Sequence, residues 1–97
     1  MPRLVILPAA RTDLLEIGDF IALDNPARAL SFLTELERVM RTAAERLGSL
    51  TARDDLYPGL RAARHGRYLI FFLETGEAVQ VVRVLHGARD LPSAFTL

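Results

Sequence analysis

The spacing of the apolar residues changes near Leu60, and this change limits the possible folds more than any other feature of the chain. Before Leu60, apolar residues recur every three or four positions, which is the spacing of one face of a helix. After it, short apolar runs are separated by glycine-containing turns, as in neighbouring strands. A helical first part and a strand-rich second part predict an α+β fold with the helices packed on one sheet.

Two helices are predicted in the first part. The first runs to about Leu23, and its apolar positions are Ala10, Leu14, Ile17 and Ile21. Asn25 then supplies an N-cap and Pro26 the first helical position of a second helix, which runs to about Leu47. The core stripe of this second helix is predicted to be Ala29, Phe32 or Leu33, Leu36, Val39 or Met40, Ala43 and Leu47. Because the break is short, the helices should form an antiparallel hairpin.

The second part predicts a meander of three antiparallel strands. The runs LRAARH, RYLIFFLE and EAVQVVRVLH are separated by Gly66 and by Thr75 and Gly76, which are hairpin signals. An edge strand at residues 3–7 completes an antiparallel sheet of about four strands, with the N-terminal strand and helix hairpin packed on it. Simple alternation in the last strand puts one set of side chains on each face. The first set is Val79, Val81, Arg83 and Leu85, and the second is Gln80, Val82, Val84 and His86.

The length and composition indicate a single globular domain over residues 1–97, with 51% apolar residues and no room for a separate cofactor domain. We therefore expect no cofactor. The longest run of large apolar side chains, residues 68–73, is too short to cross a bilayer, and Pro8 interrupts the only run that resembles a signal peptide. The absence of cysteine excludes disulfides and is typical of a cytosolic protein.

All 12 basic side chains are arginine, and they are unevenly distributed although the net charge is zero. Residues 60–97 carry five arginines against three acidic residues, whereas residues 1–59 carry seven against nine. The codon usage of a GC-rich genome is sufficient to explain the lack of lysine. Guanidinium still has chemical consequences, because it binds phosphate or carboxylate through two parallel hydrogen bonds but is a poor general base.

Three segments in succession resemble a known family. They are DLLEIGDFIALDNPARALSFLTELE, YPGLRAARHGRYLIFF and VVRVLHGARDL. Their order and spacing, from about Asp13 to Leu91, are similar to those of the ParE branch of the ParE/RelE superfamily, the toxins of type II toxin–antitoxin pairs and plasmid stabilisation systems. The resemblance implies a RelE-like fold, toxicity when unpaired, and a cognate antitoxin, expected to be a ParD-like ribbon-helix-helix protein.

The resemblance leaves the target open, because RelE-like toxins cut messenger RNA in the ribosome whereas characterised ParE-like toxins inhibit DNA gyrase. The catalytic tyrosine of the ribonucleases corresponds to Phe95, one of their arginine positions corresponds to Tyr68, and only Arg89 matches a retained arginine. We therefore expect a non-catalytic gyrase inhibitor without catalytic residues. The alternatives are a ribosome-dependent endoribonuclease that uses His86 and Arg89, and a non-toxic component of the antitoxin complex.

The residues predicted to bind the target or an anionic group lie in the basic part of the chain. They are Arg61, Arg64, Arg67, Arg83, His86, Arg89 and Phe95. Arg61, Arg64 and Arg67 fit equally well a solvated strand face or a docking surface for an acidic partner. Arg83, surrounded by valines, should be partly buried and paired with a carboxylate or carbonyl, with Asp90 and Glu74 as candidates.

Histidine is the side chain most often used for proton transfer near neutral pH, which makes His86 the candidate acid or base of this set. Its more ordinary role is a hydrogen bond to Asp90 or to a backbone carbonyl at the end of the last strand. A metal site from His65, His86 and Asp90 is not expected, because two histidines without a recognised ligand spacing fall short of one. Ser93 lacks the sequence context of a catalytic nucleophile.

The tail DLPSAFTL is expected to form no element of its own, because Pro92 ends the strand. Leu91, Phe95 and Leu97 either cap the sheet or engage the target, and the resemblance implies the second role for this region. The helix hairpin and the sheet edge are expected to present a groove. A disordered antitoxin tail should fold into it as a helix and an added strand.

Overall fold

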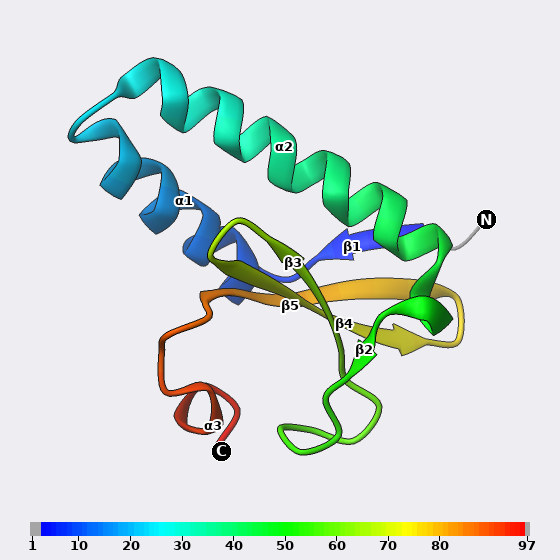
Figure 1. Cartoon of the computed structure of the whole chain (residues 1–97). Coiled ribbons are helices and arrows are strands. Elements are labelled where there is room, and N and C mark those ends of the chain that lie inside the picture. The colour runs from blue at the N-terminus through cyan, green and yellow to red at the C-terminus, as the bar shows by residue number, and fades with distance from the viewer. Residues whose placement is uncertain (1–2, 97) are drawn as a thin grey trace.

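The computed structural model describes residues 3–96 and shows a helix hairpin on one face of a five-stranded sheet (Figure 1). Along the chain the elements are β1 (Arg3–Ile6), α1 (Pro8–Ala22), α2 (Pro26–Glu45), the 3-10 turn η1 (Leu47–Ser49), β2 (Thr51–Ala52), β3 (Arg61–His65), β4 (Tyr68–Thr75), β5 (Ala78–His86) and α3 (Leu91–Ala94). The predicted α+β fold, with its N-terminal strand and helix hairpin, is confirmed.

The strand order is β1-β5-β4-β3-β2. β3, β4 and β5 form the predicted antiparallel meander. β1 joins β5 in parallel, with Arg3 opposite Ala78 and Ile6 opposite Val81, so the sheet is mixed. The two-residue strand β2 pairs with Arg61 and Ala62 and brings the number of strands to five. The first and last strands of the sequence are therefore neighbours in the sheet.

The hairpin follows its local sequence signals closely. Arg28 N–H donates to the Asn25 side chain at 3.0 Å, and Pro26 occupies the first turn of α2. A Cβ on Gly18 would lie 3.0 Å from a methyl group of Leu33, so glycine lets α1 and α2 approach closely. The buried residues of α2 are Ala29, Phe32, Leu36, Met40, Ala43 and Ala44. Within residues 3–96 no helix is long and apolar enough to cross a membrane.

A β-bulge interrupts β5 at its centre. Phe72 pairs with Val81, but Phe71 pairs with Arg83, so Val82 is an additional residue opposite β4. One inserted residue shifts the alternation of side chains that follows it.

The bulge makes the predicted alternation of β5 wrong beyond Val82. Val79, Val81 and Val84 all belong to the core under the helices, whereas Val82 and Leu85 pack on the opposite face. The prediction placed Leu85 with Val79, and Val84 with Val82, because it assumed an uninterrupted period of two.

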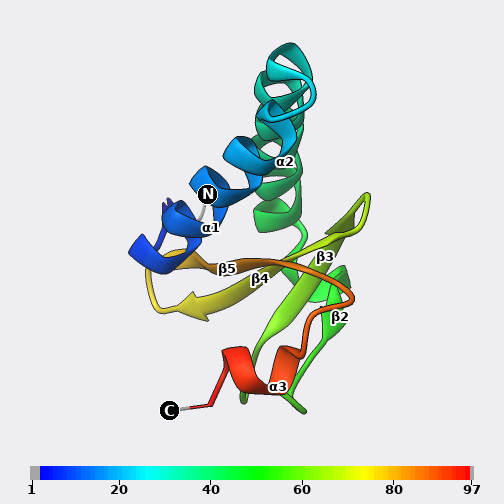
Figure 2. The ribbon, with the colours of Figure 1, turned by 90° about the vertical axis from the view of Figure 1, so that its left-hand side faces the viewer.

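The sheet face away from the hairpin carries a second, smaller core. Leu60, Phe71, Leu85 and Leu91 are buried in it, and the edge of the Phe95 ring packs on Phe71 with centroids 5.0 Å apart. α3 covers this face, on the side of the sheet opposite to the hairpin (Figure 2). The prediction that the tail forms no element is therefore wrong for residues 91–94, where Pro92 lies in the first turn of a helix. Leu97 lies outside the described residues.

Candidate functional site

Arg83 forms a double hydrogen-bonded ion pair with Asp13 between β5 and α1. Its Nε donates to Asp13 Oδ2 at 2.8 Å and its Nη2 to Oδ1 at 2.9 Å. The hydrogen bond to the Asp13 carboxylate raises the pKa of Arg83 above its ordinary value. The predicted partial burial of Arg83 agrees with its side-chain exposure of 21%. The predicted partners, Asp90 and Glu74, are wrong, because the carboxylate comes from α1.

Beyond the end of β1, the Asp13 side chain accepts a hydrogen bond from β5 that a neighbouring strand would otherwise accept. β1 ends its pairing with β5 where Leu7 N–H donates to the carbonyl of Val81, and α1 begins immediately afterwards. Val84 N–H, beyond that point, donates instead to Asp13 Oδ2 at 2.9 Å. Because Asp13 is only 5% exposed, its charge needs these partners. Arg83 therefore has a structural role in joining α1 to β5.

The turn between β3 and β4 packs against the loop that follows β5. Gly87 N–H donates to the carbonyl of Arg67 at 2.8 Å. The Arg64 guanidinium lies beside Gly87, and the Tyr68 ring stands edge-on to His86 with centroids 5.4 Å apart. These contacts bring two segments that are distant in the sequence to one end of the sheet.

We call Arg64, Arg67, His86 and Arg89 the basic tip. The three arginines are exposed, and none of them has an ion pair within the described part of the chain. Exposed guanidinium groups without internal partners are available to bind carboxylate or phosphate. The structure thus gathers four of the seven residues that were predicted to bind the target.

The His86 side chain is hydrogen-bonded to the loop that follows β5. Its Nδ1 accepts the backbone N–H of Ala88 at 3.0 Å, which assigns the proton of the neutral ring to Nε2. The basic lone pair of the ring is therefore engaged in a structural hydrogen bond. The predicted partners of His86, Asp90 or a backbone carbonyl, are wrong, and Asp90 instead accepts the Ser93 hydroxyl at 2.6 Å.

A small hollow of about 190 Å³ adjoins the basic tip. Tyr68 and His86 line it from the sheet, Arg89 from the loop after β5, and Glu16 and Phe20 from α1. Phe20 is 69% exposed, so an apolar ring flanks the polar groups. The hollow offers a phenol, an imidazole and a guanidinium to one ligand, with a carboxylate close by.

Arg61 has a structural role instead of belonging to the basic tip. Its Nη1 donates to the carbonyls of Gly48 and Leu50 at 3.2 and 2.9 Å, which satisfies backbone groups at the end of η1. The predicted arginine run is therefore divided, because Arg61 and Arg64 are three residues apart on β3 and point to opposite faces of the sheet.

His65 belongs to a separate cluster on the helix side of the sheet. Its Nε2 lies 2.8 Å from Glu35 Oε1, and Glu35 also accepts from Arg28. These bonds, that of Arg28 first, lower the pKa of Glu35 to about 2. Phe32 packs against both the His65 and Tyr68 rings. Residues 3–96 contain no group of three His, Cys, Asp or Glu side chains that could hold a metal ion.

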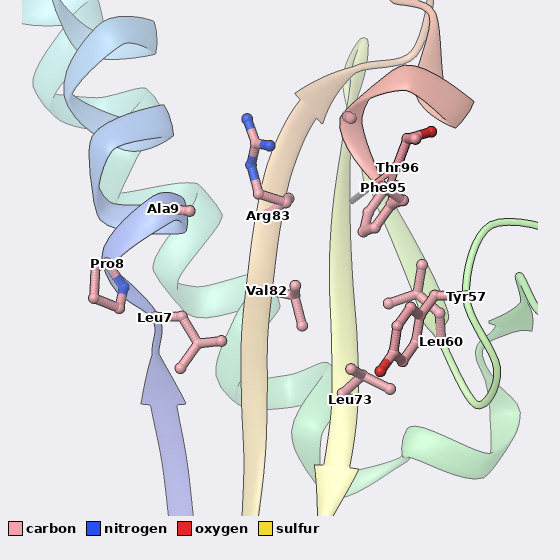
Figure 3. Close-up of a pocket in the computed structure, with 11 residues that line it drawn as sticks. Leu7, Pro8, Ala9, Tyr57, Leu60, Leu73, Val82, Arg83, Phe95 and Thr96 are labelled. Carbon is pink, nitrogen blue, oxygen red and sulfur yellow. The ribbon is translucent and has the colours of Figure 1, made fainter.

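Phe95 is also separate from the basic tip. It lines an apolar groove of about 480 Å³ on the second face of the sheet (Figure 3). Leu7 contributes from the junction of β1 and α1, Val82 and Leu73 from the strands, and Tyr57 from the loop before β3. Phe95 packs on this face of the sheet, and its predicted contact with the target stays a prediction.

Sequence reasoning missed Asp13 and Glu35 as partners of the basic residues. Asp13 did carry a signal, because it lies three residues after Ala10 and four before Ile17, within the buried stripe of α1. A carboxylate in such a stripe requires a cationic or N–H partner. Glu35 carried no such signal, since it is not among the predicted core positions of α2 and lies about one helical turn from Arg38.

The comparisons agree with this architecture. The family model described as "ParE toxin of type II toxin-antitoxin system, parDE" matches residues 4–91. A solved structure titled "Chromosomal ParDE TA system from P. aeruginosa" is 21% identical, with a TM-score of 0.75, and the match covers 89% of this chain and 96% of that chain. No curated protein sequence gives a match. By the family match over nearly its whole length, the chain belongs to the ParE toxins of type II toxin–antitoxin systems.

Proposed function

We propose that this toxin is a non-catalytic inhibitor of DNA gyrase, which it binds through the basic tip in the cytoplasm. We also propose that a ParD-like ribbon-helix-helix antitoxin neutralises it. One observation carries the first proposal: exposed arginines, which have no ion pair within residues 3–96, surround a histidine whose Nδ1 already accepts the Ala88 N–H. This arrangement supports binding rather than proton transfer, because a general base needs its lone pair free.

The two segments that carry the basic tip are already joined before binding. The hydrogen bond from Gly87 to Arg67 and the packing of Tyr68 on His86 hold its two segments together. A surface that is ordered before binding loses less conformational entropy on association. Guanidinium groups form charge-assisted hydrogen bonds to carboxylates of a protein partner, and they increase the rate of association with an acidic surface.

A ribosome-dependent endoribonuclease is the second candidate, and the hollow beside the basic tip favours it. Tyr68, His86 and Arg89 line that hollow together, and they could contact a phosphate and its neighbouring hydroxyl. Proton transfer by His86 Nδ1 would require the Ala88 hydrogen bond to break. Phe95, which takes the place of the ribonuclease tyrosine in the resemblance, lies in the second core.

Two purified assays separate these candidates. DNA supercoiling by gyrase should be inhibited by the wild-type toxin and much less by Arg64→Glu or Arg89→Glu. Arg41→Glu is a matched control, since Arg41 is exposed on α2 and pairs with Glu37, away from the basic tip. Cleavage of ribosome-bound messenger RNA without any effect on gyrase would contradict the proposal and support the second candidate.

The proposed pairing with an antitoxin is tested by co-expressing the toxin with the adjacent reading frame. A stable complex that restores growth would support neutralisation. If the protein alone leaves growth unaffected but still forms a stable complex, it is instead a non-toxic component of that complex. If no neighbouring protein binds, the proposed pairing is wrong.

A further inference from the structure

The hairpin of α1 and α2 has the sheet on one side, and leucines are exposed on it away from the sheet (Figure 1). Leu15 of α1 is 69% exposed and Leu30 of α2 is 72% exposed. Beside Leu15, the partly buried Leu14 and Leu33 line a hollow of about 290 Å³ between the helices. We call these leucines and the two charged residues of the same hollow the outer seam, which consists of Arg11, Leu14, Leu15, Leu30, Leu33 and Glu37.

The outer seam lies on one face of each helix. Leu30, Leu33 and Glu37 occupy positions i, i+3 and i+7 of α2, and Arg11 and Leu15 are four residues apart on α1. Large apolar side chains that gather at one place on a surface are more typical of a contact site than single exposed ones. The outer seam is therefore a candidate interface.

The two walls of the outer seam carry opposite charges. Arg11 of α1 is exposed and has no ion pair within residues 3–96. Glu37 of α2 is exposed, and its ion pair within that range is with Arg41 of the same helix at 3.8 Å. An exposed pair of this kind contributes little to stability. Both charges are therefore available to a partner that brings the opposite sign to each wall.

A surface with a positive wall and a negative wall is complementary to a second copy of itself. A two-fold axis along the seam places α1 of one copy over α2 of the other, so each positive wall meets a negative wall. The facing helices are then antiparallel, as neighbouring helices are in many four-helix bundles. This complementarity favours a second copy over an unrelated partner, because one surface supplies both halves of the contact.

The levels of the side chains along the helices fit this arrangement. Gly18 packs against Leu33 and the two helices are antiparallel, so Leu15 is level with the part of α2 between Leu33 and Glu37. In the two-fold contact, Leu15 of each copy therefore enters between Leu33 and Glu37 of the other. Arg11 lies about 4.5 Å along the helix axis from the level of Glu37, a distance that its side chain spans.

Thr34 is a polar residue beside the leucines, and its hydrogen bond is already made. Its hydroxyl donates to the carbonyl of Leu30 at 3.0 Å. A partner can therefore cover Thr34 without leaving the hydroxyl without an acceptor. The exposed leucines lose contact with water on association, which is the main favourable contribution to such a contact.

We propose that the outer seam joins two copies of this chain into a two-fold dimer, in which Leu15 of each copy lies between Leu33 and Glu37 of the other and Arg11 pairs with Glu37 across the interface. The two hairpins form an antiparallel four-helix bundle, and the two sheets lie on its outer sides. The dimer is a property of the free toxin and depends neither on its target nor on the antitoxin.

Sedimentation equilibrium of the purified full-length toxin, over a wide range of concentration, should show a reversible equilibrium between monomer and dimer. Leu15→Gln and Leu30→Gln should each weaken association by about tenfold or more, because both copies lose an apolar contact. At concentrations where wild type is monomeric, the thermal unfolding of both variants should match that of wild type, since these side chains are exposed in one copy.

Charge reversal tests the two-fold arrangement. Arg11→Glu and Glu37→Arg should each weaken association by about tenfold or more, because one substitution replaces two symmetric attractive contacts by repulsive ones. A mixture of these two variants should associate again as a heterodimer, since opposite charges then face each other at both places. The double variant should associate as a homodimer for the same reason. Arg67→Glu and Glu74→Arg, exposed and outside the hairpin, are matched controls that should associate like wild type.

A wild-type toxin that stays monomeric at every concentration would overturn the proposal. A dimer that the seam variants do not weaken would overturn it too, as would a mixture of Arg11→Glu and Glu37→Arg that fails to associate while both controls do. If wild type is monomeric and Leu15→Gln weakens binding of the neighbouring protein, the outer seam binds that protein and the dimer proposal is wrong.

Discussion

Asp13 and Arg83 lie 70 positions apart in the sequence, yet the Asp13 carboxylate binds the Arg83 side chain with both oxygens and the next backbone N–H of β5 with one of them. Three hydrogen bonds that this one buried carboxylate accepts join the first helix to the last strand. The basic tip follows directly from that strand, so its position depends on this connection.

Replacing Asp13 with asparagine should lower the free energy of unfolding by about 2 kcal/mol or more, because one partner of a largely buried ion pair loses its charge. Asp13→Ala should be more damaging, since Val84 N–H then loses its acceptor as well. Urea unfolding of both variants measures the effect. Asp19→Asn, an exposed carboxylate on the same helix, is the control. Equal stability of Asp13→Asn and wild type would contradict a stabilising role for the pair.

Acid should weaken the contact between α2 and the β3–β4 turn. Hydrogen bonds from Arg28 and His65 lower the pKa of Glu35 from 4.5 to about 2 in the folded protein. A group whose pKa is depressed by folding stabilises the protein above its unfolded pKa, and this contribution is lost as the pH falls from about 4.5 toward 2. Unfolding followed between these pH values should show a shallower pH dependence for Glu35→Gln than for wild type. The same slope in both proteins would refute this role of Glu35.

Arg89→Ala should reduce toxicity while preserving the fold, because Arg89 is exposed and has no internal ion pair within residues 3–96. Loss of a charge-assisted contact to the target is worth roughly 1.5 to 3 kcal/mol of binding free energy. Growth inhibition and gyrase supercoiling measure the effect, with thermal unfolding as the folding check. Unchanged inhibition by Arg89→Ala would remove this residue from the target surface.

His86→Gln and Phe95→Tyr distinguish binding from catalysis. In the binding mechanism Phe95→Tyr should retain most of the toxicity, since no proton transfer is involved. His86→Gln should reduce toxicity only through weaker binding, because His86 belongs to the basic tip and orders its loop. In a ribonuclease, loss of a general acid or base should lower the rate by about 10² to 10⁴, and a restored phenol at position 95 should raise it. The measurement is cleavage of ribosome-bound message. Message cut by wild type and spared by His86→Gln would overturn the binding mechanism.

Deleting the chain after Asp90 should destabilise the protein as well as remove the tail. Leu91 is buried and Phe95 packs on Phe71, so the deletion opens the second core and should cost about 3 kcal/mol or more. Loss of toxicity in this truncation would therefore not by itself assign target binding to the tail. Phe95→Leu keeps much of the apolar volume. If this variant is stable and loses toxicity, Phe95 contacts the target; if it stays toxic, Phe95 serves the core.

The local signals of the sequence were sufficient for most of the elements. Asn25 and Pro26 predicted the start of α2, and glycines predicted the turns of the meander, because each of these signals acts through backbone geometry within a few residues. The apolar stripe of α2 was predicted equally well. The motif order from Asp13 to Leu91 also indicated the family that the later comparison matched.

Only the tertiary structure decided which residues of the basic part are available to bind. The bulge at Val82 changed the faces of β5, Arg61 and Arg83 became structural, and the basic tip formed from two distant loops. An arginine has the same local character in each of these places. Whether it holds the fold together or meets a partner depends on which carboxylate or carbonyl lies within hydrogen-bonding distance, and those groups are supplied by chain segments far away in the sequence.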